Sequence, residues 1–418
     1  MHFQQKRTTA VLFILGIAYF IAFIFPNQNG ADNEQMLAMN SQDESFQYPF
    51  LMHMITPGKD AQETRWRLIS YGHYIYGYPF YVASALTVLP LRMIYGAALP
   101  DQISTTLLVL RQVISVLPMI LAASILVYLV TRFRNILLSI FMFIFLLTIP
   151  GVVRQNIWWW HPDALSILCV VLTFFFLDRD QMRFRRNFFL AAFFCGLAAS
   201  IKSVGVFFAV VVAGYLLVGL FQKRIKFTRA VIIGALFIVI MFLTYLFTNP
   251  LLFFPAQRER IIQVHIEHNY FFTHGWSDSD PYATGLASWL PILNGWYASI
   301  PFLLFSLVSL ALASLSKNFR TVAQLFLAWI IPLSLYLIYF IAVKPDHYWL
   351  PVMLPLFTGG FMLIQFLTEK IDNANGINPF ILWGLRLSLL ATILVITIQF
   401  VAQVQIDWPL FLRAVNPI

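Results

Sequence analysis

The longest polar stretch of the chain, residues 27–81, reads NQNGADNEQMLAMNSQDESFQYPFLMHMITPGKDAQETRWRLISYGHYIYGYPFY. It follows an apolar run directly and carries six of the 18 acidic residues, in a chain that is 60% hydrophobic and only 11% charged. Soluble domains carry about 25% charged residues, so most of this chain is expected to lie in lipid. The sequence therefore predicts an integral membrane protein with a polar loop near its start.

The composition argues against several other classes of protein. The net charge is +9, but the basic residues form short clusters between apolar runs, as cytoplasmic loops do, so we expect no nucleic-acid partner. The two cysteines, Cys169 and Cys195, lie inside apolar runs, which indicates neither a disulfide nor a cysteine metal site. No small-residue cleavage site follows the first apolar run, which is therefore read as a retained span. We interpret 1–418 as a single membrane domain.

Apolar windows of about 17 to 25 residues are long enough to cross a bilayer as helices. They predict an all-α, polytopic bundle of about 11 transmembrane helices. The expected spans are at about 8–25, 103–130, 136–150, 163–178, 187–201, 204–221, 229–248, 298–316, 320–342, 350–368 and 379–402.

The orientation follows from six positive clusters, which contain Lys6-Arg7, Arg132 to Arg134, Arg179 to Arg186, Lys223 to Arg229, Lys317 to Arg320, and Lys370. All six fall on one side, the cytoplasmic one by the positive-inside rule, if residues 74–95 do not cross. We therefore expect 74–95 to be a juxtamembrane or re-entrant element. The loops 26–102 and 249–297 then face outward. The expected location is the plasma (inner) membrane, with the polar chemistry on its extracytoplasmic side.

The Asp43-Glu44 pair is the first candidate for chemistry in the outward loops. A carboxylate at a membrane interface can act as a general base toward a hydroxyl group. A solvated acidic loop is the plainer interpretation, and it applies with more weight to Asp32.

A second candidate stretch reads NIWWWHPD, residues 156–163. The three tryptophans are typical of an interfacial aromatic belt. Asp163 stands at the mouth of an apolar helix, and an ionisable group there is a functional candidate. His161 either caps the end of that helix or contributes to the site.

Basic side chains in the outward turns are candidates for holding a phosphate. Lys202 lies at a helix end rich in small residues, where it either binds a phosphate or extends to the interface. Lys344, His347 and Tyr348 form a turn that is either a clamp for phosphate and sugar or an aromatic anchor. Arg258 is a further phosphate candidate.

The loop 249–297 also contains His265, His268 and His274. Their spacing matches no metal-binding signature, so we expect no metal.

The order of these motifs resembles that of the C-type (GT-C) membrane glycosyltransferases, in particular the protein O-mannosyltransferases and lipid A aminoarabinose transferases. An Asp-Glu pair in the first outward loop is followed about thirty residues later by 76–81, similar to the juxtamembrane helix of that family. Residues 196–202 look like the family's glycine-to-lysine turn, and 347–351 look like its late Tyr-Leu-Pro-Leu motif. The resemblance covers most of the first 210 residues and one later motif. The second acidic cluster, at Asp32, departs from the pattern.

The resemblance implies a glycosyltransferase that moves a sugar, with inversion, from a polyprenyl-phosphate donor to an unknown acceptor hydroxyl. It needs no cofactor, and its other partners are membrane lipids. The implied catalytic residues are Asp43 and Glu44, with Asp32 as the alternative base. Donor phosphate would be bound by Lys202, Arg258 and Lys344. Sugar or acceptor would be bound by Asp163, His161, His347, Tyr348 and Tyr78.

A membrane transporter or lipid flippase is the alternative that the sequence leaves open. It predicts polar groups in mid-span and broken helices in both halves of the chain. The apolar runs are nearly free of charges, which favours the enzyme.

Overall fold

The computed structural model describes residues 3–275, 282–373 and 378–416, and within these ranges the chain is helical and contains no strand. Among the described residues, eight helices are long and apolar enough to cross a membrane, or up to ten if each of two bent helix pairs is one span. This confirms the predicted all-α membrane bundle. The count of about 11 spans stays a prediction.

The chain begins with a long apolar helix and then a run of shorter helices that build the first loop. The helices are α1 (Phe3–Ala22), α2 (Ile24–Gln28), α3 (Glu34–Asn40), α4 (Gln42–Ile55), α5 (Ala61–Ile69), α6 (Tyr78–Tyr95) and the 3-10 helix η1 (Gly96–Asp101). The bundle follows. Its first part contains α7 (Ile103–Leu110), the π-helix η2 (Arg111–Val116), α8 (Leu117–Thr131), α9 (Ile136–Leu147), α10 (Pro150–Asn156), α11 (Asp163–Asp180) and α12 (Arg186–Ile201).

The remaining helices complete the bundle and the second loop. They are η3 (Ser203–Phe207), α13 (Phe208–Phe221), α14 (Phe227–Phe247), η4 (Pro250–Phe253), α15 (Pro255–His274), α16 (Leu286–Trp296), α17 (Ile300–Ala313), α18 (Arg320–Phe340), η5 (Asp346–Trp349), α19 (Leu350–Phe357), α20 (Gly359–Asp372) and α21 (Pro379–Val415). Residues 276–281 of the predicted second loop lie outside the described residues.

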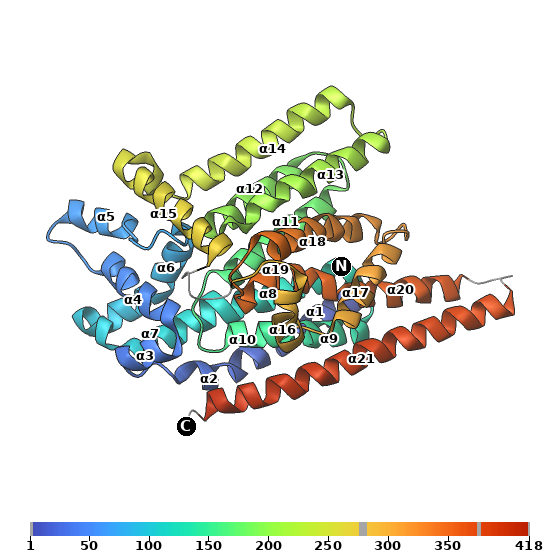
Figure 1. Cartoon of the computed structure of the whole chain (residues 1–418), viewed down its shortest axis with the longest axis horizontal. Coiled ribbons are helices and arrows are strands. Elements are labelled where there is room, and N and C mark those ends of the chain that lie inside the picture. The colour runs from blue at the N-terminus through green and yellow to red at the C-terminus, as the bar shows by residue number, and fades with distance from the viewer. Residues whose placement is uncertain (1–2, 276–281, 374–377, 417–418) are drawn as a thin grey trace.

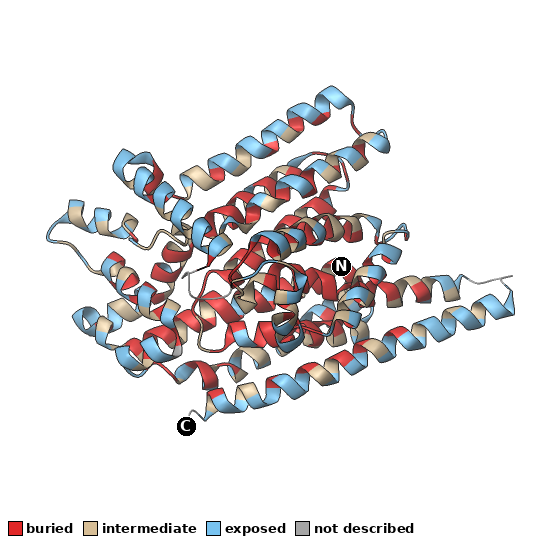
Figure 2. Ribbon diagram, viewed as in Figure 1, coloured by how far each residue is buried: buried red, intermediate tan, exposed pale blue. Residues whose placement is uncertain are grey.

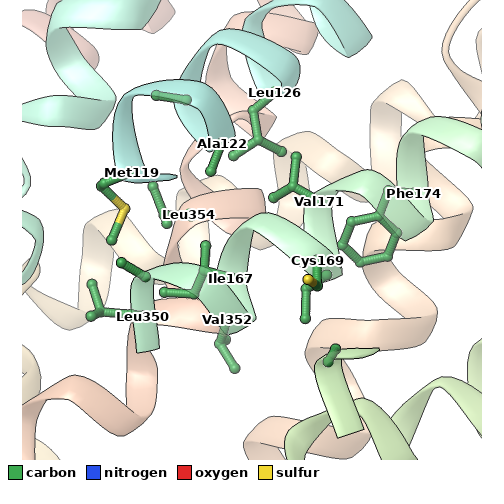
Figure 3. Close-up of a cluster of buried hydrophobic side chains, with 14 of the residues drawn as sticks. Met119, Ala122, Leu126, Ile167, Cys169, Val171, Phe174, Leu350, Val352 and Leu354 are labelled. Carbon is green, nitrogen blue, oxygen red and sulfur yellow. The ribbon is translucent and has the colours of Figure 1, made fainter. Parts of the chain in front are cut away.

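The core of the bundle lies where α8, α11 and α19 pack together, as Figure 3 shows for side chains such as Leu126, Ile167 and Leu354. Buried residues gather in the middle of the molecule, whereas α14 and α21 are exposed along much of their length (Figure 2). Their exposed side chains include Phe242 and Leu390. Apolar surface of this extent would be a liability in water and is what a lipid-facing helix requires.

The two ends of the bundle differ in structure. Figure 1 shows α4, α5, α6 and α15 gathered at one end, and the first turns of α14 and α21 at the other. The predicted loops 26–102 and 249–297 thus supply helices to the same end. This end contains the cavities described below.

Two helix pairs are bent sharply at breaks that lie at the ends of predicted spans. The pair α9 and α10 is bent by 64°, and the pair α16 and α17 by 91°. In each pair the second helix, α10 or α17, has a proline in its first turn, Pro150 or Pro301. A proline is tolerated there because the first N–H groups of a helix have no partner within the helix, but it prevents the preceding helix from continuing straight through. Part of the predicted second loop is therefore an apolar helix, α16.

The last helix runs to Val415, well past the predicted end at residue 402. The apolar window ends early because of Gln399, Gln403 and Asp407, which lie four residues apart and are buried on one face of α21. A helix of 37 residues is about 55 Å long, so α21 extends beyond a bilayer core of about 30 Å.

The segment Tyr78–Asp101 also meets the length and composition criterion for a span. Its placement at the interface, on which the predicted orientation depends, stays a prediction.

Candidate active site

Asp43 and Glu44 occupy the first turn of α4, where the helix dipole favours negative charge. Adjacent residues of a helix point about 100° apart, so the two carboxylates face different surroundings. Glu44 is fully buried and receives two hydrogen bonds from the Arg111 guanidinium, at 2.9 and 2.6 Å, and one from the backbone N–H of Trp160 at 2.5 Å. Glu44 therefore joins α4, η2 and the loop 157–162. It does not line the cavity that Asp43 lines, and its catalytic role stays a prediction.

Asp43 is half-exposed and lines a cavity of about 660 Å³, called the polar cavity below. Its other lining side chains include His73, Tyr76, Lys202 and His347. The indole Nε1 of Trp159 donates a hydrogen bond to the Asp43 carboxylate at 3.3 Å. The structure thus presents Asp43 to whatever molecule enters the cavity.

The loop 157–162 is fixed by hydrogen bonds to the polar N-terminal segment. Trp158 has a left-handed φ of 52°, and its backbone N–H donates to Asn27 Oδ1 at 2.9 Å. Trp160 is fully buried and its Nε1 donates to Ser84 at 2.9 Å. Trp159 stacks on His161 with ring centroids 4.5 Å apart. Trp159 and Trp160 therefore pack within the site, and the interfacial belt stays a prediction.

Lys202 follows the last residue of α12, and its position depends on a close approach of two backbones. The N–H of Gly77 donates to the Ile201 carbonyl at 3.2 Å, and a Cβ added at Gly77 would lie 1.5 Å from the Ser200 carbonyl oxygen. Only glycine fits there. The Lys202 ammonium donates to Asp163 Oδ1 and lies 4.9 Å from the ring centroid of Tyr348.

A second cavity of about 660 Å³, the apolar groove, adjoins the polar one. Lys202 and Ser203 line both of these cavities, and they also line a third, smaller cavity of about 330 Å³. The apolar groove runs along α14 and α15 and is lined by side chains that include Phe242, Leu246, Ile262 and Ile266. Arg258 lies on its wall. A cation therefore stands where a polar and an apolar space meet.

Three side chains meet beside Lys202 and are called the His–Asp cluster: the buried His161 and Asp163, and the partly buried His347. His161 Nδ1 lies 2.9 Å from Asp163 Oδ2, and His347 Nε2 lies 3.7 Å from the same oxygen. The other nitrogen of His161, Nε2, shares a hydrogen bond of 2.7 Å with the Tyr76 hydroxyl. The structure thus brings together four of the predicted site residues, Lys202 included.

Three other predicted residues lie away from these cavities. Asp32 is exposed and lines none of the cavities described above. The Lys344 ammonium donates to the carbonyls of Ile341 and Ala342, at 2.8 and 2.6 Å, because it caps the C-terminal end of α18. Tyr78 packs against Tyr71.

Sequence reasoning missed Tyr76 and His73 as separate site residues. His73 shares a hydrogen bond of 2.7 Å with the Tyr81 hydroxyl, and burial lowers the pKa of its imidazole to about 4 although Asp43 acts in the opposite direction. Burial also lowers the pKa of His268, which lines the polar cavity, to about 4. Both rings are thus neutral near pH 7. The sequence marks this region only as rich in Tyr and Gly.

No protein-family model matches the chain, and no curated protein matches it. The fold and site define an all-helical membrane protein with a carboxylate and an ammonium group in one cavity. The function is therefore argued from the site alone.

Proposed function

We propose that the protein is a membrane glycosyltransferase that moves a sugar from a polyprenyl-phosphate donor to an acceptor hydroxyl. One observation carries the proposal. Asp43 and Lys202 line the same polar cavity, and Lys202 also lines the apolar groove. A donor that joins a sugar to a long hydrocarbon through a phosphate has the polarity pattern of these two spaces.

In the proposed reaction, Asp43 accepts the proton of the acceptor hydroxyl as its oxygen attacks the anomeric carbon. The bond between that carbon and the phosphate oxygen breaks, and its electron pair leaves with the lipid phosphate. Attack opposite the leaving group inverts the anomeric configuration. The half-exposed Asp43 suits this step because its carboxylate faces the cavity rather than a fixed cation.

The leaving lipid phosphate gains negative charge as the bond breaks, and positioned cations stabilise such charge. Lys202 and Arg258 both line the apolar groove and are the proposed phosphate ligands. Asp163 holds the Lys202 ammonium in place through its Oδ1. His347 and Tyr348, on the cavity wall, are proposed to contact sugar or acceptor. We place this cavity on the extracytoplasmic side of the plasma membrane.

The test is transfer of labelled sugar by purified protein from a panel of polyprenyl-phosphate donors to a mixed set of acceptors. We expect a product with inverted configuration, and a loss of about 100-fold or more in Lys202→Met, since an electrostatic donor typically contributes that much. Lys344→Met is the matched control and is expected to transfer normally. Absence of transfer from every donor by folded wild-type protein would contradict the proposal.

A transporter or lipid flippase remains the second candidate, and the structure adds an observation in its favour. Bent helix pairs occur in both halves of the chain, at α9 with α10 and at α16 with α17. Buried Arg111, Gln112 and Asp407 also lie within long apolar helices. Movement of a labelled lipid phosphate across reconstituted vesicles, without any transfer of sugar, would favour this candidate.

A further inference from the structure

We propose that His161, Asp163 and His347 form a binding site for one divalent transition metal ion, for which Zn²⁺ is the best match. The three side chains each offer one ligand atom, and these atoms lie within 4.8 Å of one another. Ligands bound at about 2.0 to 2.2 Å in a tetrahedron are about 3.3 Å apart. The separations of 2.9 and 3.7 Å from Asp163 Oδ2 to the two imidazoles bracket that value.

Two of the three ligand atoms, His161 Nδ1 and Asp163 Oδ2, are buried and lie 2.9 Å apart without an aligned hydrogen bond to any described residue. His161 is fully buried, Asp163 is 3% exposed, and neither His161 Nδ1 nor Asp163 Oδ2 has an aligned hydrogen-bond partner. Leaving such atoms without a partner costs free energy. A shared metal ion would satisfy both at once.

The remaining atoms of the cluster are oriented as metal ligands usually are. When Nδ1 of His161 binds a metal, its Nε2 carries a hydrogen and donates to the Tyr76 hydroxyl 2.7 Å away. Nδ1 of His347 lies 3.5 Å from Asp346 Oδ1, so its Nε2 is the atom turned toward Asp163. A hydroxyl and a carboxylate behind two histidines are common outer partners of a metal site.

The local charge also admits a divalent cation. Asp43 and Asp346 lie beside the histidines of the cluster, to which Asp163 belongs, and the cations in contact with these three carboxylates are Lys202 and Arg154. Lys202 contacts Oδ1 of Asp163 and leaves Oδ2 to the histidines. Two imidazoles and a carboxylate suit Zn²⁺, whereas Mg²⁺ and Ca²⁺ prefer oxygen ligands.

The metal site does not depend on the proposed glycosyl transfer, so binding is measured directly. Full-length protein in detergent is stripped with a chelator, reloaded with Zn²⁺ or Co²⁺, and freed of unbound metal. We expect one Zn²⁺ per chain by elemental analysis, a visible absorption band for the Co²⁺ form, and no retention of Mg²⁺. A folded wild-type protein that retains no metal would overturn the proposal.

Variants separate this site from adventitious binding. His161→Ala and His347→Ala are expected to lose the bound metal and the Co²⁺ band, whereas His265→Ala, in the wall of the polar cavity, keeps both. Tyr76→Phe removes only an outer partner and is expected to weaken Zn²⁺ about 10- to 100-fold. Metal retained at wild-type affinity by folded His161→Ala and His347→Ala would overturn the assignment. If either alanine variant fails to fold, the Tyr76→Phe affinity decides, and an unchanged value counts against the site.

Discussion

The two sides of the first turn of α4 contrast sharply. On one side Glu44 is fully buried and bound to Arg111 and the Trp160 backbone. On the other side Asp43 is half-exposed in a cavity and receives one long hydrogen bond from Trp159. Two carboxylates that are neighbours in sequence thus have opposite surroundings. The difference teaches that burial and pairing, rather than residue type, separate an acid held by a buried cation from an acid that faces a cavity.

The largest expected change in stability comes from breaking the buried side. Glu44→Ala leaves the Arg111 charge buried without its carboxylate, which typically costs about 3 to 5 kcal/mol. We expect a corresponding loss in the free energy of unfolding, measured by denaturation in detergent. Glu34→Ala is the matched control, because Glu34 is an exposed acid in the first turn of α3.

Removing both charges tests the pair more sharply. The double variant Glu44→Gln with Arg111→Met is expected to be more stable than Glu44→Gln alone, because no charge is left buried without a partner. A double variant as unstable as the sum of its single variants would contradict a direct ion pair.

The cavity side depends on the close approach of the segment 70–77 to the end of α12. Gly77→Ala places a Cβ on the Ser200 carbonyl, so the backbones must separate. Overpacking of this kind costs about 1 to 3 kcal/mol, and it shifts Tyr76 and Lys202. We expect lower stability together with reduced sugar transfer. Gly384→Ala, where an added Cβ has no neighbour within 4 Å, is the control and is expected to be neutral or slightly stabilising.

Acid is expected to weaken the cavity side through His73. Burial lowers the pKa of His73 from the ordinary 6.5 to about 4. The nearby His161 also lowers this pKa, whereas Asp43 raises it. Between these pH values the unfolded chain binds more protons than the folded one, so stability is lost as pH falls from about 6.5 toward 4. The loss is expected to reach about 3 kcal/mol at pH 4.

Unfolding measured across this pH range checks the prediction. His73→Gln is expected to flatten the pH dependence, whereas His53→Gln, at an exposed position, leaves it unchanged. If the free energy of unfolding of His73→Gln depends on pH as steeply as that of the wild type, the pH dependence belongs to other groups.

The smallest effect is expected at Asp32. This exposed side chain lines none of the cavities described, so Asp32→Asn changes stability by less than about 0.5 kcal/mol. Transfer of sugar is expected to stay at the wild-type rate. A large loss of activity in Asp32→Asn would move the base to the first acidic cluster.

The fold was predictable wherever apolar runs coincide with single helices, as at 320–342 and α18. Prediction failed at the end of α21, because hydropathy ignores which face a polar residue occupies, and Gln399, Gln403 and Asp407 point inward. The bends at Pro150 and before Pro301 also escaped prediction, since proline is common within membrane spans as well as between them.

The site was predictable in part. Charges beside apolar helices marked Asp43, Lys202 and Asp163, because such groups are costly in a membrane. The sequence could not separate Asp43 from Glu44, since only the folded contacts with Arg111 do so. The contact of Tyr76 with His161 joins distant segments and leaves no trace in spacing.

The central claim is that Asp43 is the base of a sugar transfer. The most direct measurement is the single-turnover rate of sugar transfer by Asp43→Ala, with and without added formate, beside the same measurement on Asp32→Ala. The account predicts a loss of about 10² to 10⁴-fold in Asp43→Ala, the range typical of a general base, with partial recovery in formate. It predicts a wild-type rate for Asp32→Ala. Wild-type transfer by Asp43→Ala would contradict the account.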